Sequence, residues 1–307
     1  MPALRALRAA WPEAAITLIG LPWAATFADR FRHLLDQFVE FPGFPGLPER
    51  PADVGRFPAF LSAVQADHYD LAIQLHGSGS IVNPLVALFG ARACAGFYGP
   101  GDYVPDPPRF LPWPEHGTEV RRLLALAEFL GTPPQGEHLE FPVWDQDRER
   151  LRAAAGDLVP GRYACVHPGA SVPERRWPAD RFAAVAKWLA DRGLTVVLTG
   201  TAAEAELTRA VAGRLDLPAV ELAGRTDLGA AAALLEGARL LVCNDTGVSH
   251  LAAALGVPSV VLSTGDNPAR WAPADEDRHR VLCDDAGVSV DAVIREAADL
   301  LGRPPEP

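Results

Sequence analysis

The sequence predicts a two-domain α/β protein in which parallel strands alternate with helices. Its 307 residues are enough for two domains of roughly 100–200 residues each. Short apolar runs rich in β-branched residues alternate with segments whose apolar positions recur at helical spacing. That alternation is typical of doubly wound parallel sheets. We expect the domain boundary near residues 141–150, which gives domains 1–150 and 151–307.

The second half shows the alternation most clearly. Pro178 suits a first helical turn, and Gly193 suits the end of the same helix. The run LTVVLTG that follows is typical of a buried parallel strand. The strands predicted in this half cover residues 163–169, 194–200, 218–224, 239–244 and 258–264. The helices predicted between them cover residues 177–193, 203–215, 226–238 and 249–256.

The first half alternates less regularly. Its predicted helices cover residues 4–12, 23–34, 57–68 and 80–90, and its predicted strands cover residues 14–20, 37–43, 69–77 and 94–99. Two stretches rich in proline and glycine, 41–51 and 98–117, interrupt the pattern. Loops of such length are usually functional or mobile, although rigid surface loops are an equal alternative.

Composition and charge restrict the classes of partner. The net charge is −11, and the sequence has neither the basic face of a nucleic-acid binder nor a polybasic membrane patch. No apolar run approaches the ~20 residues of a membrane-spanning helix, and the first residues do not resemble a secretory signal. We therefore expect a cytoplasmic protein with at most peripheral membrane association, at the inner face of the membrane. Cys94, Cys165, Cys243 and Cys283 form no CxxC pair, so we expect neither a zinc site nor a disulfide framework.

Four predicted strands in the second half end in polar or glycine-rich turns. The turns are HPGAS (167–171), TGTAAE (199–204), AGRTD (223–227) and NDTGVSH (244–250). In a parallel sheet they would lie along one edge, where α/β proteins bind their ligands. This convergence predicts a binding site more strongly than any single turn does.

The turn NDTGVSH leads from a strand into a helix. A helix N-terminus offers unpaired N–H groups and partial positive charge to an anion. Gly247 would let a ligand approach the backbone, while Thr246 and His250 could add donors. Asp245 would repel phosphate and is expected to face a hydroxyl or an N–H group. The alternative is that Asp245 or Ser249 only caps the helix.

The turn HPGAS precedes a pair of arginines. Gly169, Ala170 and Ser171 form a small-residue loop, and Arg175 and Arg176 follow just before a helix. Guanidinium groups bind phosphate in bidentate geometry. A solvated arginine pair is the alternative. The sequence contains neither GxGxxG nor GxxxxGK[ST], so no dinucleotide fingerprint or P-loop is predicted.

Taken together, these segments resemble glycosyltransferase family 9, which includes the ADP-heptose:lipopolysaccharide heptosyltransferases. The resemblance rests on HPGAS with RRWP, a TG…E turn, LAGRTDL and NDTGVSHLAAALGVP in this order. It is strong over residues 155–275 and weaker over residues 2–100. It implies the GT-B class, two Rossmann-like doubly wound domains facing a cleft, with the acceptor bound by the N-terminal domain and the donor by the C-terminal one.

The resemblance also implies roles for individual residues in donor binding. Ala170 and Ser171 match positions near the donor phosphates, and Arg175 stands where the family usually has a phosphate-binding lysine. Glu204 matches an acid near the ribose, and Thr226 a position near the adenine.

The remaining implied donor contacts, Asp245, Thr246, Gly247 and His250, match the turn that holds the sugar diphosphate. Arg175 and His250 would stabilise the leaving diphosphate. With that positive potential in place, neither a metal nor a cofactor is expected.

One departure from the family lies at the N-terminus. Family members begin with an apolar strand and a Gly-Asp loop, followed by a helix similar to PALRAL. This sequence starts within that helix, so we expect its first domain to lack the first strand and the loop that carries the general base. Either the start is placed too late or the chain is a true variant without the base; we favour the former.

On the acceptor side, QLHGSGSIVNP (74–84) ends a strand. His76, Ser78 and Asn83 are candidates for recognising acceptor hydroxyls. The alternative is a glycine-rich turn capped by Ser80.

Two functions are compared. The first is an inverting, metal-independent glycosyltransferase that moves heptose or a related sugar from a nucleotide sugar, expected to be ADP-linked, to a cell-envelope glycan or lipopolysaccharide. The second is a non-catalytic protein that keeps the donor pocket but lacks the general base. A sugar-nucleotide epimerase is less favoured, because no suitable set of carboxylates and histidine can be placed.

Overall fold

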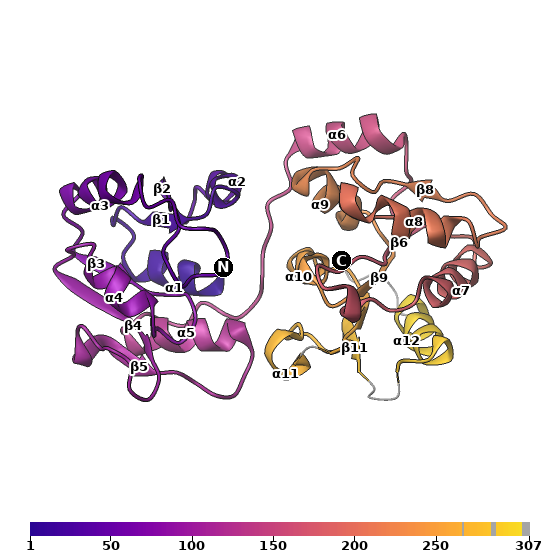
Figure 1. Cartoon of the computed structure of the whole chain (residues 1–307). Coiled ribbons are helices and arrows are strands. Elements are labelled where there is room, and N and C mark those ends of the chain that lie inside the picture. The colour runs from indigo at the N-terminus through magenta and orange to yellow at the C-terminus, as the bar shows by residue number, and fades with distance from the viewer. Residues whose placement is uncertain (266, 284–286, 303–307) are drawn as a thin grey trace. The chain divides into compact units, whose positions relative to one another are not determined.

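The computed structural model describes residues 1–265, 267–283 and 287–302. The chain divides into two compact units, Met1–Glu137 and His138–Pro307 (Figure 1). The boundary expected at residue 150 falls within α6 (Asp145–Ala155), which packs against α9 (Leu228–Glu236) of the second unit. The second unit therefore includes α6 and the segment that leads to it.

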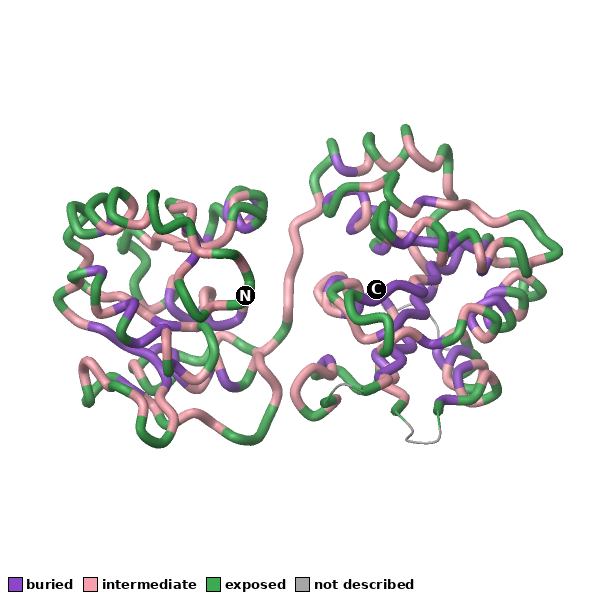
Figure 2. Tube along the Cα trace, in the orientation of Figure 1, coloured by how far each residue is buried: buried purple, intermediate pink, exposed green. Residues whose placement is uncertain are grey.

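The second unit contains a six-stranded sheet with the order β11-β10-β9-β6-β7-β8, in which every pairing is parallel. The strands are β6 (Tyr163–His167), β7 (Thr195–Leu198), β8 (Val220–Glu221), β9 (Leu240–Asn244), β10 (Ser259–Leu262) and β11 (His279–Leu282). The structure confirms the five predicted strands and adds β11 at the edge. The central strands β6, β9 and β10 are almost wholly buried, as the purple segments of Figure 2 show.

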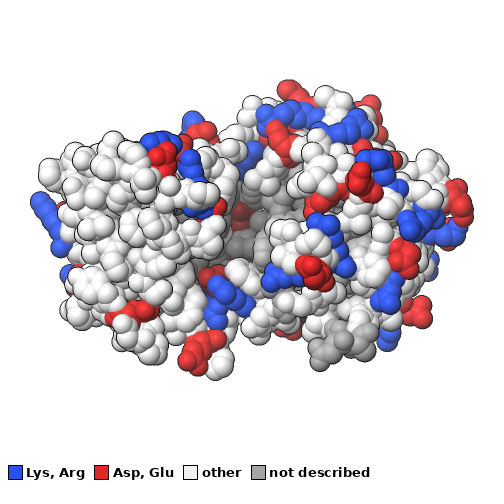
Figure 3. Space-filling model, in the orientation of Figure 1, with Lys and Arg blue, Asp and Glu red and all other residues white. Residues whose placement is uncertain are grey.

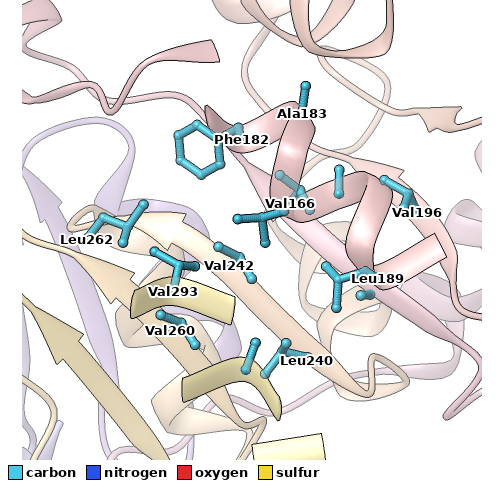
Figure 4. Packing of buried hydrophobic residues seen from close by; sticks show 14 of the residues in the cluster. Val166, Phe182, Ala183, Leu189, Val196, Leu240, Val242, Val260, Leu262 and Val293 are labelled. Atoms are coloured by element: carbon cyan, nitrogen blue, oxygen red, sulfur yellow. The ribbon is translucent and has the colours of Figure 1, made fainter. Parts of the chain in front are cut away.

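Helices cover both faces of this sheet, which makes the unit doubly wound. One face packs against α7 (Ala179–Ala190), α8 (Ala205–Ala212) and α12 (Val290–Gly302). Figure 4 shows part of that packing, with Phe182 and Leu189 of α7 and Val293 of α12 around the strand residues. The other face packs against α6, α9 and α10 (Gly247–Ala254). The short α11 (Pro268–Trp271) follows β10, and 3-10 turns occupy Pro173–Arg175 and Ala202–Glu204.

The strands of the first unit form two separate parallel sheets, β1-β2 and β3-β4-β5. The strands are β1 (Thr17–Gly20), β2 (Gln37–Glu40), β3 (Leu71–Ile73), β4 (Ala93–Tyr98) and β5 (Phe110–Pro112). The helices are α1 (Pro2–Ala10), α2 (Ala24–Arg30), α3 (Phe57–Ala66), α4 (Val82–Ala87) and α5 (Glu119–Phe129). Such a division is expected when a doubly wound domain lacks one central strand.

The segment 98–117, predicted as a long loop, is partly ordered into regular structure. It contains a 3-10 turn at Pro107–Arg109 and the strand β5, which pairs with β4. Trp113 closes the segment by packing its ring edge-on against Phe97, with 5.1 Å between ring centroids. The prediction of an irregular loop is therefore wrong for β5. In the described part of the chain, no helix has the length and apolar character needed to cross a membrane.

Candidate functional site

The four polar turns predicted to converge do follow adjacent strands of one parallel sheet. They come after β9, β6, β7 and β8, which are neighbours in that order. From β6 the chain moves outward through β7 to β8, whereas from β9 it moves the other way through β10 to β11. The strand order therefore reverses between β6 and β9, and the carboxyl edge at such a switch point is where open α/β sheets bind ligands.

Asn244 joins the two loops that flank the switch point. Its side chain is completely buried at the end of β9. The Nδ2 group donates to the carbonyl oxygens of Pro168 at 2.8 Å and Gly169 at 3.2 Å, and Oδ1 accepts from the Trp177 N–H at 3.0 Å. One amide thus fixes both ends of the loop after β6 to the end of β9.

The amino end of α10 is capped and open. Thr246 is the N-cap, and Ser249 donates its hydroxyl to the Thr246 carbonyl oxygen at 2.7 Å. Gly247 is exposed, and a Cβ added there would meet no other atom within 4 Å. The packing of the fold therefore does not require glycine at this position. The missing side chain leaves room for a ligand in front of the positive end of the helix dipole.

His250 lies one turn into α10. Burial lowers the pKa of its imidazole below the ordinary value, and the nearby Asp245 carboxylate only partly opposes that shift. The ring is therefore neutral at pH 7, and it offers a hydrogen bond but no full charge. Its ring centroid lies 6.2 Å from that of Trp271, and the Arg270 guanidinium lies over the other ring at 4.6 Å from the centroid. Arg270, which the sequence reasoning did not select, brings a cation to the neighbourhood of α10.

The two arginines after β6 have different surroundings. The Nε group of Arg176 donates to the Ala170 carbonyl oxygen at 2.9 Å, so it stabilises its own loop. Arg175 is half-exposed, and its carbonyl oxygen accepts from the Thr264 hydroxyl at 2.6 Å. Ala170 is buried and Ser171 is exposed. The role of Arg175 toward an anion stays a prediction.

Glu204 lies against the loop after β6. Its Oε2 accepts from the Thr201 N–H at 2.7 Å and from the Thr201 hydroxyl at 2.9 Å, and the side chain is 9% exposed. A Cβ on Gly169 would collide with this carboxylate, which explains the glycine. His167, at the end of β6, contacts the Thr199 hydroxyl at 3.0 Å. Burial lowers the pKa of His167, with the Glu204 charge opposing the shift.

Thr226 completes the residues selected on this edge. It is half-buried just before α9. The next residue, Asp227, caps α9 by accepting from the Ala230 N–H at 2.8 Å and pairs with Arg150 at 3.1 Å. The side chain of Asp227 is therefore engaged in structure, and Arg225 of the same turn donates to the Glu221 carbonyl oxygen at 3.1 Å. The role of Thr226 in recognition stays a prediction.

The acceptor candidates lie in the first unit, in the loop after β3. His76 is exposed, with Nε2 3.1 Å from the Glu49 carboxylate, and Ser78 is half-buried. Asn83 is fully buried and donates to the carbonyl oxygens of Phe97 at 2.9 Å and Tyr103 at 3.0 Å. Any part of Asn83 in recognition is therefore indirect, through the position of the loop.

Two residues that shape these loops escaped the sequence reasoning. Asn244 was passed over within NDTGVSH, and buried Gln74 was passed over within QLHGSGS. Gln74 accepts from the His76 N–H at 3.1 Å and donates to the Gly77 carbonyl oxygen at 3.2 Å. In both cases an amide lies at the end of an apolar strand, as the last residue of β9 or the first after β3, and that pattern is a usable signal for a residue that fixes a loop.

Charges on the visible face of the second unit are mixed in sign. On the face shown in Figure 3, basic and acidic side chains are interspersed over the second unit. Within the residues that the structure describes, no group of three or more histidine, cysteine or acidic side chains could hold a metal ion. The predictions about metal and nucleic acid remain predictions.

Comparison with known proteins gives a family. The model of glycosyltransferase family 9 (heptosyltransferase) matches residues 58–295. Lipopolysaccharide heptosyltransferase 2 of Escherichia coli K12 is 28% identical over 285 residues, which cover 86% of this chain and 78% of that protein.

Solved structures have the same fold. A family 9 glycosyltransferase of Veillonella parvula superposes with a TM-score of 0.79 at 21% identity, covering 98% of this chain and 92% of that one. The E. coli heptosyltransferase WaaC with ADP gives 0.71 at 20% identity, covering 97% and 94%. The resemblance and the GT-B fold class predicted from the sequence are thereby confirmed. The chain belongs to glycosyltransferase family 9 and is a glycosyltransferase.

Proposed function

We propose that this glycosyltransferase moves a heptose or a closely related sugar from an ADP-linked donor to a lipopolysaccharide acceptor, with inversion and without a metal. The open amino end of α10 at the switch point carries the donor proposal. It offers backbone N–H groups and a glycine whose side-chain space is empty. The identity of the sugar and acceptor is suggested by the heptosyltransferase relatives.

In the proposed reaction an acceptor hydroxyl attacks the anomeric carbon. A new C–O bond forms, the bond to the diphosphate breaks, and the hydroxyl proton passes to a general base. Negative charge grows on the departing diphosphate, where Arg175 and the N–H groups near Gly247 stabilise it. His250 adds a neutral hydrogen bond. We expect the general base in the first unit and assign it to no described residue.

Each proposed donor-binding residue is assigned to one part of the nucleotide sugar. Ala170, Ser171 and Arg175 would contact the phosphates, Glu204 the ribose and Thr226 the adenine. Thr246 and Gly247 would hold the sugar diphosphate together with His250, and Asp245 would face a sugar hydroxyl. His76 and Ser78 would contact the acceptor, with Asn83 holding their loop.

The donor site is tested by thermal unfolding with ADP and with ADP-heptose. Both ligands should raise the melting temperature of the unaltered protein, because binding to the folded state stabilises it. Gly247→Ala should abolish the shift without lowering the melting temperature of the free protein. Arg175→Ala and His250→Ala should also remove most of the shift. Arg192→Ala, at the opposite edge of the sheet, is the matched control and should leave the shift intact.

The results of these binding and transfer experiments distinguish the donor-site assignment from the proposed sugar transfer. If no nucleotide sugar shifts the melting temperature, the site assignment is wrong. If ADP-heptose binds but no sugar reaches a lipopolysaccharide acceptor lacking heptose, the non-catalytic alternative replaces the proposed transfer.

A further inference from the structure

Ser263, the first residue after β10, has a buried hydroxyl group without a hydrogen-bond partner. The residue is 4% exposed, and among the residues that the structure describes no group bonds to its Oγ atom. The buried serines Ser249 and Ser259 of the same unit differ in this respect. Ser249 donates to the Thr246 carbonyl oxygen at 2.7 Å, and the Ser259 hydroxyl lies 2.8 Å from a ring nitrogen of His279. Because burying an unpaired hydroxyl costs free energy, the position of Ser263 requires an explanation.

Strand pairing places Ser263 beside Asp245. The strands β9 and β10 are parallel, with Leu262 opposite Asn244. The Asp245 N–H then donates to the Leu262 carbonyl oxygen at 3.0 Å. On the other side of β10, the Ser263 N–H donates to the Leu282 carbonyl oxygen at 2.9 Å. The ladder therefore continues past the last strand residues, and Ser263 and Asp245 are neighbours at the usual strand spacing of about 4.8 Å.

Both side chains belong to the face of the sheet that α10 covers. Val261, two residues before Ser263, packs in the same cluster as Leu251 of α10. Cys243, two residues before Asp245, packs there as well. Since side chains along a strand alternate between its faces, Ser263 and Asp245 lie on this side too. The helix α10 begins at the carboxyl edge of the sheet, so the Ser263 hydroxyl lies on the side of its first turn.

The chain that follows Ser263 crosses the switch point. The Thr264 hydroxyl donates to the Arg175 carbonyl oxygen at 2.6 Å. Arg175 follows β6, and β9 lies between β6 and β10 in the sheet. The segment after β10 therefore passes over the end of β9. It brings Ser263 to the edge proposed for the donor, although none of the four polar turns follows β10.

The chemistry of this pair of side chains suits a neutral hydroxyl group. A serine hydroxyl has one proton to donate and carries no charge, whereas an ionised carboxylate can only accept. A ligand hydroxyl beside both could accept from Ser263 and donate to Asp245. A phosphate at the same place would be repelled by the carboxylate.

We infer that Ser263 is a further donor-binding residue, which hydrogen-bonds one hydroxyl of the transferred sugar together with Asp245. The inference rests on the proposed function, since it requires a nucleotide sugar at this edge. A site built to bond a substrate hydroxyl discriminates against sugars that lack it, because its buried groups are then left unpaired. Ser263 therefore contributes to the choice of sugar and not to the affinity for the nucleotide.

The test compares the binding of ADP and of ADP-heptose by calorimetric titration. Ser263→Ala should weaken the binding of ADP-heptose about fivefold and change that of ADP by less than about twofold. The melting temperature of the free variant should be equal to or slightly above that of the unaltered protein, because the lost hydroxyl has no described partner.

Ser259→Ala is the matched control. It removes a buried hydroxyl from the same strand, but one that contacts His279 at the far end of β10. This variant should lower the melting temperature of the free protein by about 3 °C. The ratio of its affinities for ADP-heptose and ADP should stay that of the unaltered protein.

A second measurement removes the partner from the ligand. It uses ADP-heptose derivatives that each lack one sugar hydroxyl. One derivative should bind the unaltered protein about as weakly as ADP-heptose binds the Ser263→Ala variant. For this derivative alone, neither Ser263→Ala nor Asp245→Asn should weaken binding further.

Other results would overturn the inference. If Ser263→Ala weakens ADP and ADP-heptose equally, the hydroxyl serves the nucleotide. A melting temperature lowered as in Ser259→Ala, with unchanged affinities, would make it a structural group. No change in affinity would show that the sugar does not reach Ser263, and different derivatives for Ser263 and Asp245 would show that they share no hydroxyl. If neither ADP nor ADP-heptose binds the unaltered protein, the proposed donor site itself is wrong.

Discussion

His279 is a buried histidine on β11 that contacts a hydroxyl group of the neighbouring strand β10. Its Nδ1 lies 2.8 Å from the Ser259 hydroxyl of β10, and the residue is 3% exposed. Burial lowers its pKa to about 4, and the nearby Asp275 carboxylate opposes only part of that shift. The neutral ring is therefore the form that the folded unit holds between β10 and β11.

This depressed pKa predicts how stability depends on pH. Between pH 4 and about 6.5 the histidine is protonated in the unfolded chain but stays neutral in the folded protein. The free energy of unfolding therefore falls as the pH is lowered through this range. The contribution of His279 should be complete above pH 6.5 and smaller by about 2 kcal/mol at pH 5. His279→Gln, which can still bond to Ser259, should remove this part of the slope in urea unfolding at pH 7 and pH 5. Equal slopes in both proteins would contradict the assignment.

At the scale of the element, the turn between β7 and α8 depends on the loop after β6. The Glu204 carboxylate caps Thr201 and occupies the space above Gly169. Since the loops after β6 and β7 belong to neighbouring strands, a side chain introduced into one loop contacts the other. The small residues of HPGAS therefore serve packing as well as any ligand.

Gly169→Ala should accordingly destabilise the second unit. The new methyl group displaces Glu204 and breaks its bonds to Thr201, so we expect a loss of roughly 1–3 kcal/mol in urea unfolding. Gly247→Ala is the matched control, because its Cβ meets nothing and its stability should stay within about 0.5 kcal/mol. If both substitutions cost the same, the contact with Glu204 is not the reason for the glycine.

The elements also show what sequence patterns can predict. The inner strands β6, β7, β9 and β10 were predictable because short apolar runs, β-branched in β7, ended in glycine or polar residues. The strand β5 was not, because Phe110–Pro112 lies among prolines and becomes a strand only by pairing with Gly96, Phe97 and Tyr98. The polar turns were predictable as a group from strand alternation. The hydrogen bonds of the Asn244 side chain were not predictable, because its partners are about 70 residues away in the sequence.

At the scale of the whole molecule, the two units differ in how completely their sheets are formed. The second has one sheet of six strands with buried inner strands. The first has sheets of two and three strands, in which β4 is buried but β1, β3 and most of β2 are half-buried. Stability follows buried apolar area, so the first unit should be the weaker.

Unfolding of the chain should therefore take place in two steps. Hydrogen exchange followed by mass spectrometry across a urea series should show β1 and β3 exposed at a midpoint at least roughly 0.5 M below that of β6 and β9. Ligand at the donor site should raise the second midpoint and leave the first unchanged, because the proposed contacts to ADP lie in the second unit. A single coincident transition would show that the units unfold cooperatively.

The bonds of Asn244 have a thermodynamic consequence for the switch point. Because they fix the loop after β6 to the end of β9, the conformational entropy of that loop is lost when the unit folds. A ligand that arrives at this edge then meets a preorganised surface, and less of its interaction energy is consumed in ordering the chain. Calorimetry on Asn244→Ala would register this as a more unfavourable binding entropy, even where every residue that touches the ligand is retained.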